Sequence, residues 1–176
     1  AQLWQSTASD LDDIELVIIF GTDHAGGLGM LTPTTQNYST PFGVLQTDTD
    51  AISHIASVLG PEKAFEEEFH HIREHSIELA AVWMHHAMRE KPLSVVPILC
   101  GSFNHFILGA QNPRDDEDIG KLITCLREIA YGRRTLVIAA GDLAHVGPAF
   151  GDLMPVDEIG MNNLAEADKM SLDAIQ

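Results

Sequence analysis

Two apolar stretches of this chain each run into a glycine and then into a histidine. Leu16–Phe20 leads into Gly21–His24, and Leu136–Ala140 leads into Gly141–His145. Each corner also carries an aspartate. Histidine and carboxylate together can ligate a metal ion or transfer protons near neutral pH. We therefore take the two corners as the first candidates for chemistry.

The elements that must position these corners are buried strands. Apolar runs predict strands at about 15–21, 94–100 and 135–140, although Pro97 weakens the second because proline cannot donate to a ladder. Helical patterns separate them, which predicts a layered α/β fold with a central, mostly parallel or mixed sheet flanked by helices. The carboxyl ends of parallel strands share one edge, and ligands bind there. That edge would carry Asp23, His24, Asn104, His105, Asp142 and His145.

The remaining pattern is helical except for one excursion. Residues 1–10 indicate the end of a helix, and residues 25–48, rich in Gly, Thr and Pro, indicate partly extended chain. Asp50 is expected to cap a helix that Gly60 ends. Helices are also expected at Ile77–Met88, apolar nearly all round and therefore buried, after Asp115–Asp116, and at 162–175.

A dense polar cluster, Glu74–Glu78, precedes the apolar helix. Charges there must be paired or functional. One interpretation directs Glu74 and His75 into a common pocket; the other is an acidic first turn favoured by the helix dipole. His70 and His71 are adjacent, so on a helix they diverge and make poor joint ligands.

The single histidines also have structural interpretations. His24 could satisfy a turn backbone, and Asp142 could cap a turn before His145. His105 is more easily explained as an exposed loop residue, and His85 and His86 as core or surface residues.

Composition limits the class of function. The 176 residues include 26 acidic and 10 basic side chains, a formal net charge of −16, which argues against nucleic-acid binding. No apolar run is long enough to span a membrane, and no signal peptide is visible. Cys100 and Cys125 form no recognisable motif and are expected to be buried thiols. We expect an acidic cytoplasmic protein, with residues 1–176 as a single domain.

The ordered motifs resemble the MEMO family, protein B of the AmmeMemoRadiSam system. The resemblance rests on Gly21–His24, on Tyr38–Gly43 leading to Asp48, and on the Glu-His-Ser-Ile-Glu string at 74–78. It continues through Val96–Leu99 with Gly101 and ends on Gly141–His145. It covers most of residues 15–150.

The resemblance implies a fold related to the LigB-like class III extradiol dioxygenases, which are non-haem Fe(II) enzymes. His24 would be a metal ligand. His145 would be the acid–base catalyst, and Asp142 would line the same pocket. Fe(II) or Cu is the cofactor that this implies, with oxidoreductase chemistry on a small molecule.

The chain also departs from the family pattern. Neither the upstream Pro-His-Ala-Gly-like ligand segment nor the late Cys or Glu ligand has a match here, so we expect weak metal binding and an incomplete chain. Leu79–Trp83 also differs from the residues that the family has after the Glu-His-Ser-Ile-Glu string, so part of the pocket wall differs. Two alternatives stay open. One is a non-catalytic binding module with a vestigial pocket that acts with a radical-SAM partner, and the other is a hydrolase that uses a metal-bound water.

Overall fold

The computed structural model describes residues 11, 13–88, 93–109 and 112–174. The helix expected at 1–10 lies outside the described residues. The chain divides into two compact units, residues 1–141 and 142–176.

Three parallel strands form the centre of the first unit. β1 (Leu16–Thr22) lies between β5 (Ser94–Cys100) and β6 (Thr135–Ala140). In register, Ile18 of β1 faces Val96 of β5 and Val137 of β6. The predicted strand positions are therefore confirmed, and Pro97 lies inside β5, opposite Ile19.

The glycine- and threonine-rich excursion supplies three short strands. β2 (Leu31–Pro33) pairs antiparallel with the carboxyl end of β5. β3 (Tyr38–Thr40) and β4 (Gly43–Thr47) form a hairpin, and β4 joins β5 in parallel at its amino end. The sheet is thus mixed and mostly parallel, as the sequence predicts.

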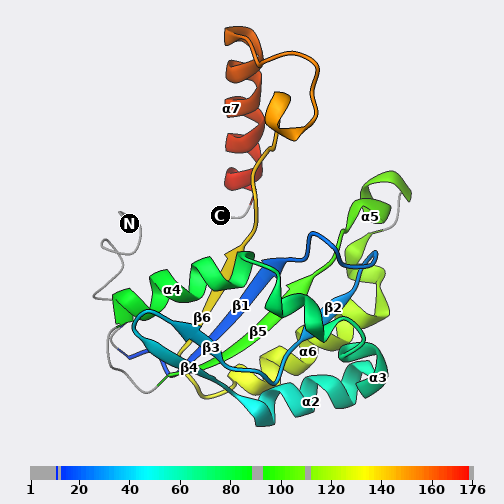
Figure 1. The fold of residues 1–176 in the computed structure, drawn as a ribbon. Coiled ribbons are helices and arrows are strands. Elements are labelled where there is room, and N and C mark those ends of the chain that lie inside the picture. Colours follow the sequence, from blue (N-terminus) through cyan, green and yellow to red (C-terminus); the bar gives the residue numbers. More distant parts are fainter. Residues whose placement is uncertain (1–10, 12, 89–92, 110–111, 175–176) are drawn as a thin grey trace. The chain divides into compact units, whose positions relative to one another are not determined.

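Helices cover both faces of this sheet (Figure 1). On one face α2 (Thr49–Leu59) and α6 (Glu117–Ala130) share a core with Leu16 and Ile18. On the other face α4 (Ser76–Met88) shares a core with Val17 and Ile19. Alternate residues of β1 are therefore buried in different cores, which explains why the sequence of the strand is continuously apolar.

Three details of the helices differ from the sequence prediction. The cap of α2 is Asp48, whose carboxylate accepts from Ala51 N, and Asp50 lies inside the first turn. α4 is buried on one side only, since Leu79 and Trp83 are 56% and 44% exposed. In α6, the apolar stripe of the sequence would place Ile123 in the core, but its side chain is exposed. Apolar composition overstated burial because one face of each helix lies outside the layers.

Short helices fill the connections. Gly60 ends α2, as predicted, and Pro61 opens α3 (Pro61–Ala64). A 3-10 turn, η2 (Glu68–Ile72), then leads to α4. α5 (Asn104–Gly109) and η3 (Pro113–Asp115) lie between β5 and α6, whose cap is Asp116.

The second unit holds η4 (Pro148–Phe150) and α7 (Glu158–Asp173). Asp157 caps α7 by accepting from Gly160 N, and Asp152 accepts from Gly147 N. The helix predicted near 162–175 is confirmed, with an earlier start. Within the described part of the chain, no helix is long and apolar enough to cross a membrane.

Gly21 allows α4 to begin against β1. A Cβ at this position would lie 2.5 Å from both Ile77 Cγ1 and Ser76 Oγ. The Ser76 hydroxyl also donates to the carbonyl of Thr22, at 2.8 Å. The start of α4 is therefore held directly on the last residues of the central strand.

We expect Gly21→Ala to destabilise the chain by about 1–3 kcal/mol, because the added methyl group must push Ser76 and Ile77 away from β1. Urea denaturation measures the change. Gly120→Ala is the control: it lies in α6 with open space around it and should be neutral or stabilising by up to about 1 kcal/mol. Equal effects of the two substitutions would contradict a tight contact at Gly21.

Candidate functional site

A shallow apolar pocket lies at the carboxyl ends of the three parallel strands. It has a volume of about 360 Å³ and is lined by the last residues of β1, β5 and β6 and by Gly101–Phe103. Cys100 is part of this lining, and its burial raises the pKa of the thiol to about 12. Cys100 is therefore a neutral thiol at physiological pH, and the polar chemistry lies in the residues that follow β1.

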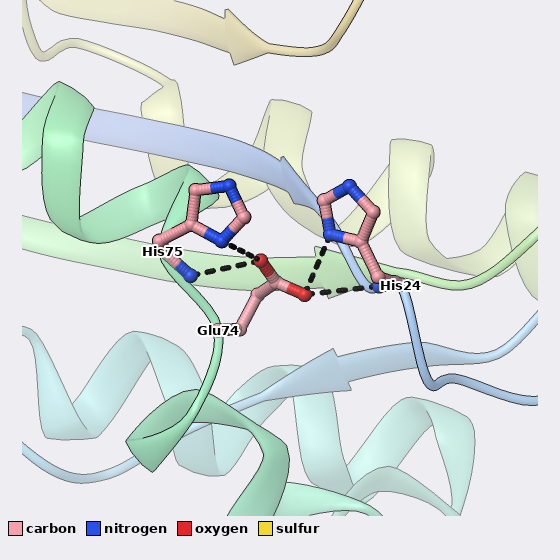
Figure 2. Close-up of side chains that lie close together, drawn as sticks. All are labelled: His24, Glu74 and His75. Carbon is pink, nitrogen blue, oxygen red and sulfur yellow. Dashed lines mark hydrogen bonds and ion pairs between the residues drawn. The ribbon is translucent and has the colours of Figure 1, made fainter. Parts of the chain in front are cut away.

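Glu74 joins the corner after β1 to the start of α4. Its Oε2 accepts from the backbone N and from Nδ1 of His24, both at 2.9 Å. Its Oε1 accepts from the backbone N of His75 at 2.8 Å and of Ser76 at 3.3 Å, and lies 3.1 Å from His75 Nδ1. Figure 2 shows the carboxylate between the two imidazoles. One side chain thus orients both histidines.

The two imidazoles are stacked, with ring centroids 5.2 Å apart and planes inclined by 10°. An ionised carboxylate only accepts hydrogen bonds, so the Nδ1 atom of His24, which is hydrogen-bonded to Glu74, carries the proton. In the neutral His24 ring the lone pair then belongs to Nε2, which points away from Glu74 (Figure 2). His24 is 45% and His75 62% exposed, so solvent reaches both rings.

The electrostatics of Glu74 result from two opposing effects. Burial, with 7% of the side chain exposed, raises its pKa. The hydrogen bonds from His24, His75 and Ser76 outweigh that effect and lower the pKa from 4.5 to about 2. Glu74 is therefore a buried carboxylate that keeps its negative charge at any physiological pH.

Both sequence interpretations of the polar cluster describe part of this arrangement. Glu74 accepts from the first backbone N–H groups of the α4 segment, as an acidic first turn would. The same carboxylate also contacts His24, 50 residues earlier in the chain.

A second group of ligand-type side chains lies beside the first. His70 Nδ1 is 2.8 Å from Asp23 Oδ2, and Glu67 accepts from Gly27 N with both oxygens at 3.1 Å. Ligand atoms of Asp23, Glu67 and His70 lie within 4.8 Å of one another. The hydrogen bond to Asp23 raises the pKa of His70. Sequence reasoning missed Glu67, because the acidic run 66–68 resembled an exposed helix face.

The neighbouring histidines do not join the His24 group. His71 points away from His70, as predicted, and contacts the Thr32 carbonyl and the Tyr38 hydroxyl. His105 lies on α5, where its ring packs beside Phe106, with centroids 3.9 Å apart. The expected grouping of His105 with His24 is not among the contacts of the described residues.

Asp142 and His145 belong to the second unit. There His145 Nδ1 lies 2.9 Å from the Leu143 carbonyl, and its ring meets Phe150 edge-on. A carbonyl only accepts, so Nδ1 donates and a neutral His145 has its lone pair on Nε2. The catalytic roles expected for Asp142 and His145 stay predictions.

The first group has the donors of a transition-metal site. Ligand atoms of His24, Glu74 and His75 lie within 4.8 Å of one another. Imidazole is a ligand that suits both iron and copper. The two solvent-exposed rings could supply it, and Glu74, which accepts from the Nδ1 side of His24, orients an imidazole as its hydrogen-bond partner.

Comparison with known proteins assigns the same family that the motifs suggest. The model of a family described as Memo-like protein matches residues 3–176. A MEMO1 family protein of Nitrosopumilus maritimus (strain SCM1) is 32% identical over 133 residues, 74% of this chain and 43% of the relative. One of Thermococcus onnurineus (strain NA1) is 31% identical over 142 residues, 78% of this chain and 44% of the relative. The chain spans less than half the length of these relatives.

The depressed pKa of Glu74 makes its contribution to stability depend on pH. The stabilisation is fully present above pH 4.5, the ordinary value, and disappears as the pH falls through about 2. The contribution of this pKa shift to the free energy of unfolding is at most about 3 kcal/mol. We expect Glu74→Gln to lower the free energy of unfolding at pH 7, and expect this deficit to shrink when urea denaturation is repeated at pH 3.

The matched control is Glu62→Gln, which removes one negative charge from an exposed position on α3. A deficit for Glu74→Gln that stays constant between pH 7 and pH 3, or one no larger than that of Glu62→Gln, would contradict the role of the hydrogen bonds around Glu74.

Proposed function

The chain belongs to the Memo-like protein family, and from this premise we propose that it contributes a dioxygenase-like metal pocket for oxidoreductase chemistry on a small molecule. The observation that carries the proposal is the pairing of His24 and His75 through the ionised carboxylate of Glu74. A hydrolytic role has no separate observation in its favour.

The arrangement of hydrogen bonds supports His24 as a ligand. A metal-binding histidine commonly donates its second ring N–H to a carboxylate, which fixes the tautomer and makes the other nitrogen more basic. Glu74 accepts from the Nδ1 side of His24 in this way and also holds its backbone. His24 Nε2 is then the donor atom, and His75 is held in a parallel orientation beside it.

Fe(II) or Cu held by these residues would supply Lewis-acid and redox chemistry. The chain's own contribution is to bind and orient. Glu74 keeps two imidazoles aligned, and the start of α4, anchored by Ser76 on Thr22, keeps Glu74 in place. For the whole protein we propose His145 as the group that moves a proton and Asp142 as a polar wall residue.

Metal titration under anaerobic conditions tests the proposal. We expect Fe(II) or Cu(II) to bind the 176-residue chain weakly, His24→Ala to abolish binding, and Glu74→Gln to weaken it by about 10–100-fold, because the amide holds the imidazole less firmly. Calorimetry, and the copper absorption spectrum, measure the changes.

His54→Ala is the control, since His54 is also an exposed histidine near a carboxylate, with Nε2 3.7 Å from Glu128. Equal metal binding by the parent chain and His24→Ala would overturn the proposal. Metal-free protein that instead forms a stable complex with a radical-SAM enzyme would favour the non-catalytic binding module.

A further inference from the structure

A larger pocket has Glu74 among its lining residues. Its volume is about 550 Å³, within the range of small-molecule sites. The wall is built from the chain leading into β3, from η2 and from the start of α4, and its members include Tyr38, Glu68, His71 and Glu78. No motif of the sequence predicts it, because the hairpin and η2 meet only in the fold.

The charge of the wall has one sign. Three carboxylates line the pocket, those of Glu68, Glu74 and Glu78, and the described lining contains no lysine or arginine. Two of them are fixed. Glu68 Oε1 accepts from the hydroxyl of Thr34 at 2.7 Å and from the backbone N of Thr35 at 3.0 Å, and Glu74 is held as described above. A fixed negative wall is preorganised for a positive ligand.

A half-buried pair of side chains, His71 and Tyr38, adds a hydrogen-bond acceptor and no positive charge. Burial lowers the pKa of His71, so its ring is neutral. Its Nε2 donates to the Thr32 carbonyl at 2.8 Å, and its Nδ1 therefore accepts from the Tyr38 hydroxyl at 2.6 Å. The Tyr38 proton is thus committed to His71, and the phenolic oxygen is left as an acceptor.

The rim of the pocket is apolar. Phe69 and Ile72, both in η2, line the pocket and are exposed to solvent. Both side chains would therefore be stabilised by an apolar group that covers them.

We propose that this pocket binds a small organic ammonium compound with a flat apolar body. The ammonium group, which has three donors and no acceptor, faces the carboxylates and the Tyr38 oxygen. The body lies against Phe69 and Ile72. An anion of the same shape would meet three like charges, and a simple amine would leave the apolar rim uncovered.

The proposal does not depend on the metal function. Glu74 belongs to both the pocket and the His24 group, but Tyr38, Glu68 and Glu78 line the pocket and are not part of the His24 group. Binding is therefore measured on the 176-residue chain freed of metal with a chelator, so that failure here and failure of the metal titration are separate results.

The probes are tyramine, its anionic analogue 3-(4-hydroxyphenyl)propionate, and methylamine. We expect saturable binding of tyramine by calorimetry or by NMR shifts of pocket residues, and binding weaker by on the order of ten-fold or more for the other two. Glu78→Gln, at an exposed position outside the core, should weaken tyramine about two- to five-fold. Phe69→Ala should weaken tyramine and leave methylamine unchanged.

Glu62→Gln is the matched control and should leave tyramine binding unchanged, because Glu62 is exposed and outside the pocket lining. Circular dichroism confirms that each variant is folded. The proposal is overturned if tyramine and the propionate bind equally, if tyramine does not bind, or if Glu78→Gln and Glu62→Gln have the same effect.

Discussion

The site depends on one buried carboxylate. An ionised side chain that is 7% exposed is costly unless its oxygens are satisfied, and Glu74 is satisfied by groups from two distant segments, the corner at His24 and the start of α4. Each segment alone satisfies only one of the two carboxylate oxygens: the corner at His24 donates to Oε2, and the start of α4 donates to Oε1. The charge of Glu74 therefore holds the two segments together, and their position orients the histidines.

The sheet makes this approach possible. Gly21 has no side chain, so Ser76 and Ile77 reach the backbone of β1, and the Ser76 hydroxyl binds the Thr22 carbonyl. His24 follows two residues later and Glu74 precedes Ser76 by two, so the contact at Gly21 sets their separation. The geometry of the candidate site is thus a consequence of strand–helix packing.

The sequence was sufficient for the central strands and for His24 at a strand end, because apolar runs and glycine corners are local signals. It could not choose between the interpretations of Glu74, since its partner lies 50 residues away and the acidic first turn has the same local pattern. It overstated the burial of α4, where Leu79 and Trp83 face outward. No sequence pattern predicted the pocket beside Tyr38, because the threonines and glutamates that line it are equally common on ordinary protein surfaces.

The two proposed ligands share a single negative charge. Glu74 contacts the two imidazoles and is also among the residues that line the larger pocket. A metal ion at the imidazoles and an ammonium group in the pocket would each be attracted to its carboxylate and would repel one another. The low exposure of the Glu74 side chain limits screening by solvent. Occupation of one site must therefore lower affinity at the other, and by linkage the two effects must be equal.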